Sequence, residues 1–569
     1  MNRVSAAPEA VLDAALGDRA QATAAGATTT WRWSADGDRA EAYPSEYSAR
    51  LDAFGLHRYY APPEWGGASD DHEVMLRLWR TVARRDLAAT VAHGKTYLGT
   101  APVWIAAQPE QAATVAAAVL SGAPVGCALS EPEHGADLVN GSVTATAHDG
   151  GFRLDGVKWP INNGTRSTHL TVLARTADAS TARSHSMFLI ERAALPPGSW
   201  RQLPKVHTHG LRTLDLSGIE FSGARIPASA LLGAEGTGIE IALKSLQLTR
   251  TMCAAMSLGA AEHALRLVAE PGPRLDEPGA GHVVARCAAL LAAAEAATLV
   301  GARSVHGLTG ELSVTSAVVK SVAPALADRV IRELAELLGP QAWSMDGPGL
   351  GAFQKLARDH DVVSVFDGST PVNRASLIGQ FPRLARRLAS GEHDDDGLAE
   401  AAAIGAPPRR LDRALLSLAS RTGCSVLQGL ADVAASDPVR ADPGLARQAA
   451  GLHAAALQLS ALMSQVRPAP RPPMAAYELA AAYELCFAGA ACLHLWSARG
   501  SSRVGEPLWQ DGLWVRAALY ALSGPLAELL GEPRPAPSPD ERRIFGRLST
   551  VILAAAADSG PVTPFGTAL

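Results

Sequence analysis

Apolar residues follow two different periods along the chain. From the start to about Ala123, and again from Gly236 to about Leu388, alanine-rich stretches show the apolar spacing of helices, and alanine favours helices because it loses no side-chain entropy there. Between them, segments such as HLTVLART (169–176) and HSMFLIE (185–191) carry short β-branched or alternating runs bounded by Gly and Asp, which predict strands and hairpin turns. The predicted order is helical, then β, then helical.

A second helical region follows residue 410. The acidic run GEHDDDG (391–397) and the proline-containing GAPPRR after it predict a solvated linker. We therefore expect a mainly α protein with a central β domain, divided into five segments: an N-terminal helical domain (1–125), a central β domain (126–233), a helical bundle (234–388), a linker (389–410) and a C-terminal helical extension (411–569).

Composition narrows the class of protein. Of 569 residues, 47% are hydrophobic and 19% are charged, which is enough apolar material for large cores. The 51 Lys and Arg against 56 Asp and Glu leave a net charge of -5, and this balance argues against a nucleic-acid partner because phosphate binding needs clustered basic charge. Six cysteines without a CxxC pair exclude a zinc ribbon and suit a reducing compartment.

Neither a membrane span nor a secretion signal is predicted. The apolar run HVVARCAALLAAAEAATLVGAR (282–303) is interrupted by Arg286 and Glu295, and the first residues carry acidic groups where a signal peptide has its apolar core. His207 and His209 form a pair without a third ligand at metal-binding spacing, so a loop is favoured and no metal site is predicted. These observations indicate a cytoplasmic enzyme.

Three segments carry the candidate chemistry: CALSEPEHGADL (127–138), DGVKWPINNGT (155–165) and KLARDHDVVSVFDGSTPVNR (355–374). In this order they resemble the acyl-CoA dehydrogenase family of flavoproteins, whose members commonly show T-E-P-x-x-G-S-D, N-G-x-K-x-W-I-T-N-G and Y-E-G-T-x-x-I-Q-R. The resemblance extends over about residues 40–385. It implies a helical domain, a β-barrel-like domain and a helical bundle, with FAD bound between the last two.

The resemblance places the first two segments against the flavin. The backbone of Leu129 and the hydroxyl of Ser130 would contact its pyrimidine end. Pro160 and Asn162 stand where the family has an aromatic and a hydroxyl side chain, and the amide of Asn162 can still donate a hydrogen bond to N5. Taken without the resemblance, residues 127–131 also fit a capped strand end, and Trp159 fits a buried core residue.

Asp367, in FDGST, stands where the family has its catalytic glutamate. The resemblance implies that its carboxylate removes the α-proton of an acyl thioester while the β-hydride moves to flavin N5. Since that proton is weakly acidic, the base benefits from a pKa raised by burial. Aspartate is one methylene shorter than glutamate, so the substrate sits nearer, the reaction is slower or the chemistry has diverged. A turn aspartate that caps the next turn is the structural alternative.

Further residues are assigned to cofactor and substrate by the same resemblance. Arg274 would reach the FAD pyrophosphate across a subunit interface, Gly339 would let the backbone approach a phosphate, and Ser369 would keep a hydroxyl near the cofactor. The residues assigned to the substrate are Ala136, Arg250, Phe366 and Gly368. For Arg250, a salt bridge on the helix surface is the alternative.

The leading hypothesis is an FAD-dependent dehydrogenase that α,β-desaturates an acyl thioester, carried either on CoA or on a carrier protein. An electron-transfer flavoprotein would accept the electrons. The extension resembles that of longer family members, where it covers a surface used for tetramer assembly, so a homodimer is expected. The altered motifs favour a specialised substrate, as in secondary metabolism. Two alternatives stay open: a flavin oxidase or monooxygenase that uses an Asp base, as nitroalkane oxidases do, and a non-catalytic acyl-binding protein.

Overall fold

The computed structural model describes residues 7–17, 31–178, 181–269, 275, 277–467, 469–499 and 506–566. Its contacts divide the chain into two compact units. The helical unit comprises Met1–Asp13, His72–Arg85 and Arg250–Leu569, and the mixed unit comprises Ala14–Asp71 and Asp86–Thr249. Both units are therefore discontinuous in sequence, which a division into successive segments does not anticipate.

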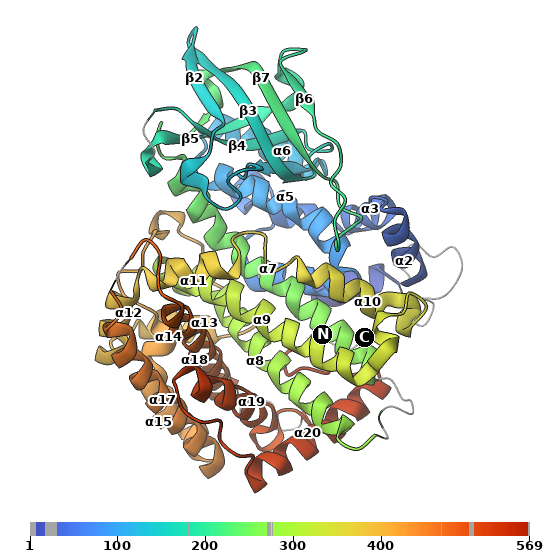
Figure 1. Ribbon diagram of the computed structural model, residues 1–569, viewed down its shortest axis with the longest axis vertical. Coiled ribbons are helices and arrows are strands. Elements are labelled where there is room, and N and C mark those ends of the chain that lie inside the picture. Colours follow the sequence, from blue (N-terminus) through green and yellow to red (C-terminus); the bar gives the residue numbers. More distant parts are fainter. Residues whose placement is uncertain are drawn as a thin grey trace, which may run out of the picture. The chain divides into compact units, whose positions relative to one another are not determined.

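The mixed unit contains helices and a twisted sheet (Figure 1). Its α-helices are α2 (Trp31–Ala40), α3 (Ser45–Phe54), α5 (Leu87–Ala106) and α6 (Pro109–Leu120). The strands are β1 (Val125–Ala128), β2 (Thr144–His148), β3 (Gly151–Asn162), β4 (His169–Arg175), β5 (His185–Glu191), β6 (Trp200–Gln202), β7 (Leu216–Pro227) and β8 (Leu231–Leu232). Within the described residues the strand order is β6-β7-β3-β2-β4-β5-β8, and β1 pairs with β4 in parallel.

Local sequence explains how β3 forms. Asp149 and Gly150 both have positive φ and connect β2 to β3 as a two-residue hairpin turn, which is what an Asp-Gly pair favours. Strand β3 then pairs antiparallel with β7, with one irregularity between Leu154 and Asp155 and a second between Lys158 and Ile161. Proline cannot donate to a sheet ladder, so Pro160 lies within the second irregularity. The disturbed ladder is the part of β3 that carries the second predicted flavin segment.

The helical unit is built around α8 (Ala280–Gly307), which contacts α4, α9, α13, α18, α19 and α20. Its other α-helices are α1 (Pro8–Ala15), α4 (His72–Ala83), α7 (Gly238–Ala269, which enters this unit at Arg250), α9 (Leu312–Leu338), α10 (Pro348–Asp361), α11 (Thr370–Ile378), α12 (Phe381–Ser390), α13 (Asp395–Ala402), α14 (Ser425–Gln428), α15 (Leu430–Ala435), α16 (Asp437–Arg440), α17 (Pro443–Ser464), α18 (Met474–Arg499), α19 (Leu513–Leu529) and α20 (Pro539–Ala557).

Among the residues that the structure describes, two helices of this unit are long and apolar enough to cross a membrane: Ala280–Gly307 and Met474–Ala498. Their most apolar windows are 89% and 83% buried inside the protein. The surrounding helices supply the apolar environment that a bilayer would otherwise provide. Both are therefore core helices of the helical unit.

The acidic run predicted to be a solvated linker begins a helix instead. The side chain of Asp394 accepts a hydrogen bond from the Gly397 N–H at 2.9 Å and caps α13. Asp395 and Asp396 lie in the first turn, where negative charge is favourable because N–H groups point that way. Leu398 is buried, and α13 contacts α8. Charge alone does not distinguish a linker from a helix N-terminus.

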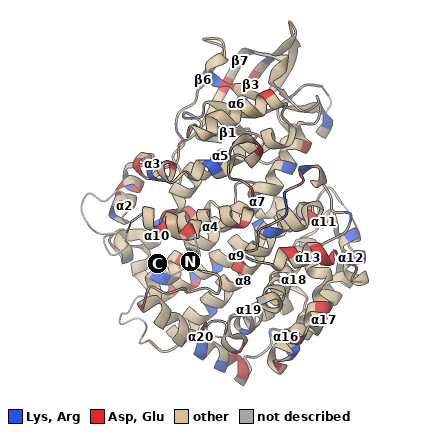
Figure 2. Cartoon of the chain, turned by 180° about the vertical axis from the view of Figure 1, so that it is seen from behind, with Lys and Arg blue, Asp and Glu red and all other residues tan. Residues whose placement is uncertain are grey.

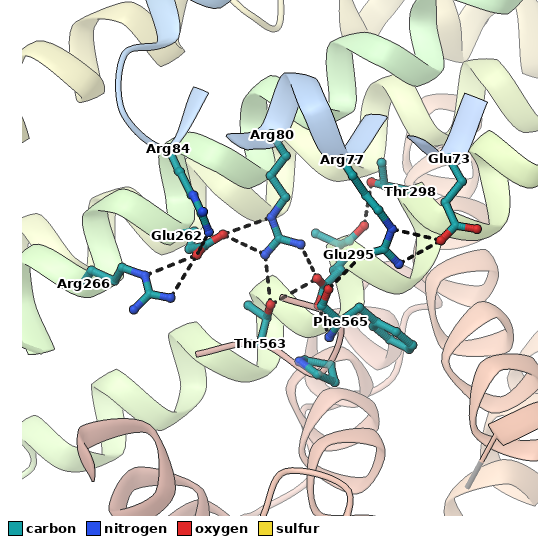
Figure 3. Close-up of polar contacts among 12 residues, drawn as sticks. Glu73, Arg77, Arg80, Arg84, Glu262, Arg266, Glu295, Thr298, Thr563 and Phe565 are labelled. Atoms are coloured by element: carbon teal, nitrogen blue, oxygen red, sulfur yellow. Dashed lines mark hydrogen bonds and ion pairs between the residues drawn. The ribbon is translucent and has the colours of Figure 1, made fainter. Parts of the chain in front are cut away.

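Charged groups inside the helical unit connect α4 to the rest of it. Figure 3 shows a row of arginines from α4 facing Glu262 of α7 and Glu295 of α8. Arg80 donates to Glu262 at 3.0 Å and also pairs with Glu295. The C-terminal segment completes the network, because Thr563 accepts from Arg80 at 2.9 Å and donates to Glu295 at 3.1 Å. Elsewhere, Figure 2 shows Lys and Arg interspersed with Asp and Glu along the described helices.

Candidate active site

The turn between α10 and α11 carries Asp367, the predicted base. Asp367 and Gly368 have φ values of 56° and 92°, so two successive residues occupy the left-handed region. Asp tolerates this conformation better than most residues, and Gly tolerates it freely. The Asp367 residue is 9% exposed. The sharp turn thus places a carboxylate in the interior of the helical unit.

Arg250 of α7 binds the backbone of this turn. Its Nε donates to the Asp367 carbonyl oxygen at 3.0 Å, and the side chain is buried. The φ of 92° favours glycine at position 368, and an added Cβ would also lie close to Arg250 Nη2, at 3.0 Å. Burial lowers the pKa of Arg250 to about 10, against the opposing attraction of Asp367 and Cys253. Arg250 is thus a buried cation beside a carboxylate, not a surface salt bridge.

Cys253 also contacts Asp367, although sequence analysis did not single it out. Its Sγ donates to Oδ2 of Asp367 at 3.1 Å, and Cys253 is 1% exposed. It lies three positions after Arg250 on α7, and side chains at that spacing share one helix face. The spacing was visible in the sequence, but only the fold shows which segment that face meets.

Two further residues hold the turn from its other sides. Asn373 donates from Nδ2 to the carbonyls of Gly368 at 2.8 Å and Ser369 at 3.2 Å. Lys320 of α9 donates to the Val363 carbonyl at 2.7 Å and lies 5.5 Å from the centre of the Phe366 ring. Ser369 precedes α11 as its N-cap residue without a capping bond from its side chain. The backbone from 363 to 369 is therefore held at several points.

Ser257, His360 and Asp328 form an arrangement with the distances of a hydrolytic triad. His360 Nε2 is 2.9 Å from Ser257 Oγ, and its Nδ1 is 2.6 Å from Asp328 Oδ1. Such distances suit a nucleophile and its base. However, Ser257 is fully buried in the middle of α7, where no substrate reaches it. The arrangement connects α7, α9 and α10.

In the mixed unit, an ion pair joins the two segments predicted to face the flavin. Lys158 of β3 donates to Glu131 at 2.7 Å and to the Leu129 carbonyl at 2.9 Å. Glu131 also accepts from the Ser142 N–H and hydroxyl, at 2.6 and 2.7 Å. The Trp159 N–H donates to the Ser130 carbonyl at 3.0 Å. The segment after β1 is thereby fixed against β3.

Electrostatics favour the ionised form of Glu131. Burial by itself would raise the pKa of Glu131, but the Lys158 ammonium and the hydrogen bonds from Ser142 outweigh it and lower that pKa to about 2. The carboxylate is therefore charged at neutral pH. Glu131 and Lys158 are the E of S-E-P and the K of V-K-W, and sequence analysis assigned neither a role.

Within the second segment, the Trp-Pro pair is more accessible than a core strand. Trp159 is partly exposed and Pro160 is exposed, so the alternative of a buried core Trp159 does not hold. Asn162 makes a long 3.4 Å contact from Nδ2 to the Val91 carbonyl, and its Oδ1 is buried without a partner among the described residues. An amide with unused capacity at a buried position leaves room for an added hydrogen-bonding group.

The predicted site residues divide between the two units. Ala136 is exposed in the turn after Glu131. Gly339 has φ 60° and ψ -142°, a conformation for glycine, and no protein atom lies within 4 Å of its Cβ position. Arg274 lies outside the described residues. The mixed unit holds Leu129, Ser130, Ala136, Pro160 and Asn162, and the helical unit holds Arg250, Gly339, Phe366, Asp367, Gly368 and Ser369.

Comparison with known proteins gives two family matches and a shared fold. Residues 126–224 match the acyl-CoA dehydrogenase middle domain, and residues 236–380 match the acyl-CoA dehydrogenase C-terminal domain. A Mycobacterium leprae protein described as a probable acyl-CoA dehydrogenase is 27% identical over 353 residues, which is 60% of this chain and 89% of the relative.

Solved structures extend the likeness. An acyl-CoA dehydrogenase from Bacillus anthracis, complexed with FAD, has a TM-score of 0.71 at 16% identity, over 97% of this chain and 95% of that one. The prolyl acyl carrier protein oxidase AnaB has a TM-score of 0.57 at 16% identity, over 64% of this chain and 96% of its own. The predicted fold class, mainly α with a central β domain and a C-terminal helical extension, is confirmed. Residues 126–224 and 236–380 of this chain therefore carry the middle and C-terminal domains of the acyl-CoA dehydrogenase family.

Proposed function

We propose that the protein is an FAD-dependent oxidoreductase that introduces a double bond between Cα and Cβ of an acyl thioester, with Asp367 as the base. One observation carries the proposal. The Asp367 carboxylate is buried in the family's C-terminal domain, and α7 binds both its side chain and its backbone. A base held at a defined place is what removal of a weakly acidic α-proton requires.

Each residue of the turn has a part in this reaction. Asp367 takes the α-proton on its carboxylate. Arg250 keeps the Asp367 backbone in its left-handed conformation through the 3.0 Å bond to the carbonyl, and this orients the Asp367 N–H to polarise the thioester carbonyl. Such a fixed donor stabilises the negative charge that develops on that oxygen. Gly368 leaves the space that the Arg250 guanidinium occupies.

FAD, when bound, supplies the acceptor for the β-hydride. Candidate residues for holding it are Leu129, Ser130 and Asn162 in the mixed unit taken by itself, and Gly339 and Ser369 in the helical unit taken by itself. Three features of these residues are compatible with FAD. They are the buried Oδ1 of Asn162 without a partner among the described residues, the Ser369 side chain that makes no capping bond, and the open space beside Gly339. An isoalloxazine ring offers both donors and acceptors, and an amide can meet either.

The thioester carrier and the assembly belong to the proposal as well. The acyl group would ride on CoA or on a carrier protein, and an electron-transfer flavoprotein would take the electrons. The helical extension contains large buried side chains such as Trp509, Trp514 and Tyr483, so it is a packed part of the helical unit. We expect a cytoplasmic homodimer with a specialised substrate, since Ala136, Pro160, Asn162 and Asp367 all depart from the family pattern.

A flavin oxidase is the second candidate, because Asp367 replaces the usual glutamate and an Asp base also suits oxidation of other acidic carbon centres. Oxygen distinguishes the two candidates. A dehydrogenase, once reduced by substrate, would stay reduced in air until an electron-transfer protein is added. An oxidase would regain its flavin absorbance within seconds and release hydrogen peroxide.

The first experiment is an absorbance spectrum of the purified protein before and after anaerobic addition of an acyl-CoA panel. Flavin bands that bleach with one thioester would support the dehydrogenase. Asp367→Asn should keep the yellow colour and lose exchange of the α-proton with deuterium oxide, whereas Asp361→Asn, at an exposed carboxyl ending α10, should keep both. A protein that takes up no FAD would overturn the proposal and favour a non-catalytic acyl-binding protein.

A further inference from the structure

We propose that Cys253 is a positioning residue for Asp367: its thiol donates to Oδ2 and holds the carboxylate in the orientation that accepts the α-proton. The proposal rests on the proposed function, because it assigns Cys253 a role in the step that Asp367 performs. It goes beyond that function in naming a second residue on which the step depends.

The contact is short and buried. Sγ of Cys253 lies 3.1 Å from Oδ2 of Asp367, in a place where Cys253 is 1% exposed. A thiol is a weak donor in water, but a carboxylate removed from water is a strong acceptor, and hydrogen bonds to ionised groups are shorter and stronger than those between neutral groups. The contact therefore restrains rotation of the Asp367 side chain about Cα–Cβ and Cβ–Cγ.

Cys253 acts together with its neighbours on one face of α7. Positions 250, 253 and 257 follow the helical repeat, and each binds the chain between 360 and 367. Arg250 binds the backbone of Asp367, Cys253 binds its carboxylate, and Ser257 binds His360 at 2.9 Å. Helix α7 thus holds the base through three contacts. It binds the backbone of Asp367, the side chain of Asp367, and His360 on α10, the helix that precedes the turn.

A neutral donor suits this position. The charged and titratable groups that bind this stretch of chain are Arg250 and Cys253 from α7, Lys320 from α9 and His360 from α10. Arg250 and Lys320 donate to backbone carbonyls, and the Cys253 thiol donates to the carboxylate. A hydrogen-bond donor to an ionised carboxylate stabilises its ionised form. A thiol supplies that hydrogen bond without adding a second buried cation, which would make the carboxylate a weaker base.

The test compares Cys253→Ala and Cys253→Ser with Cys492→Ala, a matched truncation of another fully buried helical cysteine. The readout is deuterium exchange at the α-carbon of straight-chain acyl-CoAs of four to sixteen carbons, measured from pH 5 to 9. Cys253→Ala should slow exchange about tenfold, as expected for loss of a hydrogen bond to a charged group, and should move the acid limb of the profile to higher pH. Cys253→Ser should recover most of the rate, because a hydroxyl also donates.

The outcomes separate this inference from the function it rests on. If Asp367→Asn abolishes exchange while Cys253→Ala keeps the wild-type rate and pH profile, the positioning role is wrong and the base stands. If Cys253→Ala and Cys492→Ala slow exchange equally, without a shift in the acid limb, the effect is general packing and the role is again wrong. If wild-type protein exchanges neither the acyl-CoA panel nor the same acyl groups loaded on a carrier protein, or if Asp367→Asn still exchanges, the proposed function fails and this inference falls with it.

A measurement without substrate checks the contact itself. Cys253→Ala, Asp367→Asn and the double variant form a cycle of thermal unfolding midpoints. If the two residues are coupled, the shift in midpoint of the double variant differs from the sum of the two single-variant shifts. Strict additivity would overturn the contact and with it the positioning role.

Discussion

Nζ of Lys158 lies 2.7 Å from Oε1 of Glu131, and each of these charged side chains is 2% exposed. They come from the two segments that the sequence places beside the flavin, 131 in the first and 158 in the second. The same ammonium binds the Leu129 carbonyl. The pair therefore sets the backbone of a predicted cofactor contact as well as neutralising a buried carboxylate.

Lys158→Met should destabilise the protein by about 3–5 kcal/mol, because it leaves Glu131 as an uncompensated buried charge. Urea unfolding followed by circular dichroism measures the change. The control is Arg153→Met, which removes a solvent-exposed ion pair with Asp155 on the same strand and should cost at most about 1 kcal/mol. Equal losses for the two variants would contradict the importance given to the buried pair.

Gly368→Ala should reduce both stability and α-proton exchange. At φ 92° an added Cβ is strained, and it would lie 3.0 Å from Arg250 Nη2, so we expect a loss of about 1–3 kcal/mol and displacement of the Asp367 turn. Gly546→Ala is the matched control, because that glycine lies in α20 with no atom within 4 Å of its Cβ position. The control should be neutral or stabilising by up to about 1 kcal/mol. A functional Gly368→Ala would show that the turn does not need its glycine.

Thr563→Val should destabilise the helical unit even though the residue lies near the C-terminal end of the described chain. The substitution preserves shape but leaves Arg80 and Glu295 without the hydroxyl between them, which we expect to cost about 1–3 kcal/mol. Thermal unfolding tests this against Thr550→Val, an exposed threonine of α20 that should change stability by about 0.5 kcal/mol or less. An unchanged Thr563→Val would mean that the network of Figure 3 does not depend on the C-terminal segment.

His494 should make the protein less stable in mild acid. Burial lowers the pKa of His494 to about 4, while its Nε2 binds the Val426 carbonyl at 2.9 Å. Between about pH 6.5 and pH 4 the unfolded chain therefore binds a proton that the folded chain does not, so stability falls as pH falls through this range. His494→Gln removes this dependence, worth up to about 3 kcal/mol. Unfolding free energies at pH 7, 6, 5 and 4.5 should fall less steeply for the variant, and parallel curves would contradict the assignment.

The sequence predicted the order of helical and β regions, which the structure confirms. Apolar spacing distinguished the helical stretches from the strands. The motifs led to the family and to Asp367. The sequence was a poorer guide to secondary structure where the same composition is compatible with two structures. The acidic run at 394–396 is equally compatible with a linker and with a helix N-terminus. In the structure it begins α13, where the Asp394 side chain makes a capping hydrogen bond.

By itself the sequence determined the order of elements, the family and the residue type at each motif position, because periodicity and spacing are properties of the chain alone. The tertiary structure decided which faces meet. Cys253 matters because the α7 face it shares with Arg250 lies against the Asp367 turn, and Lys158 matters because β3 lies against the segment after β1. These contacts join residues more than one hundred positions apart in one case and twenty-seven in the other. Their energies depend on burial and geometry, which no local pattern encodes.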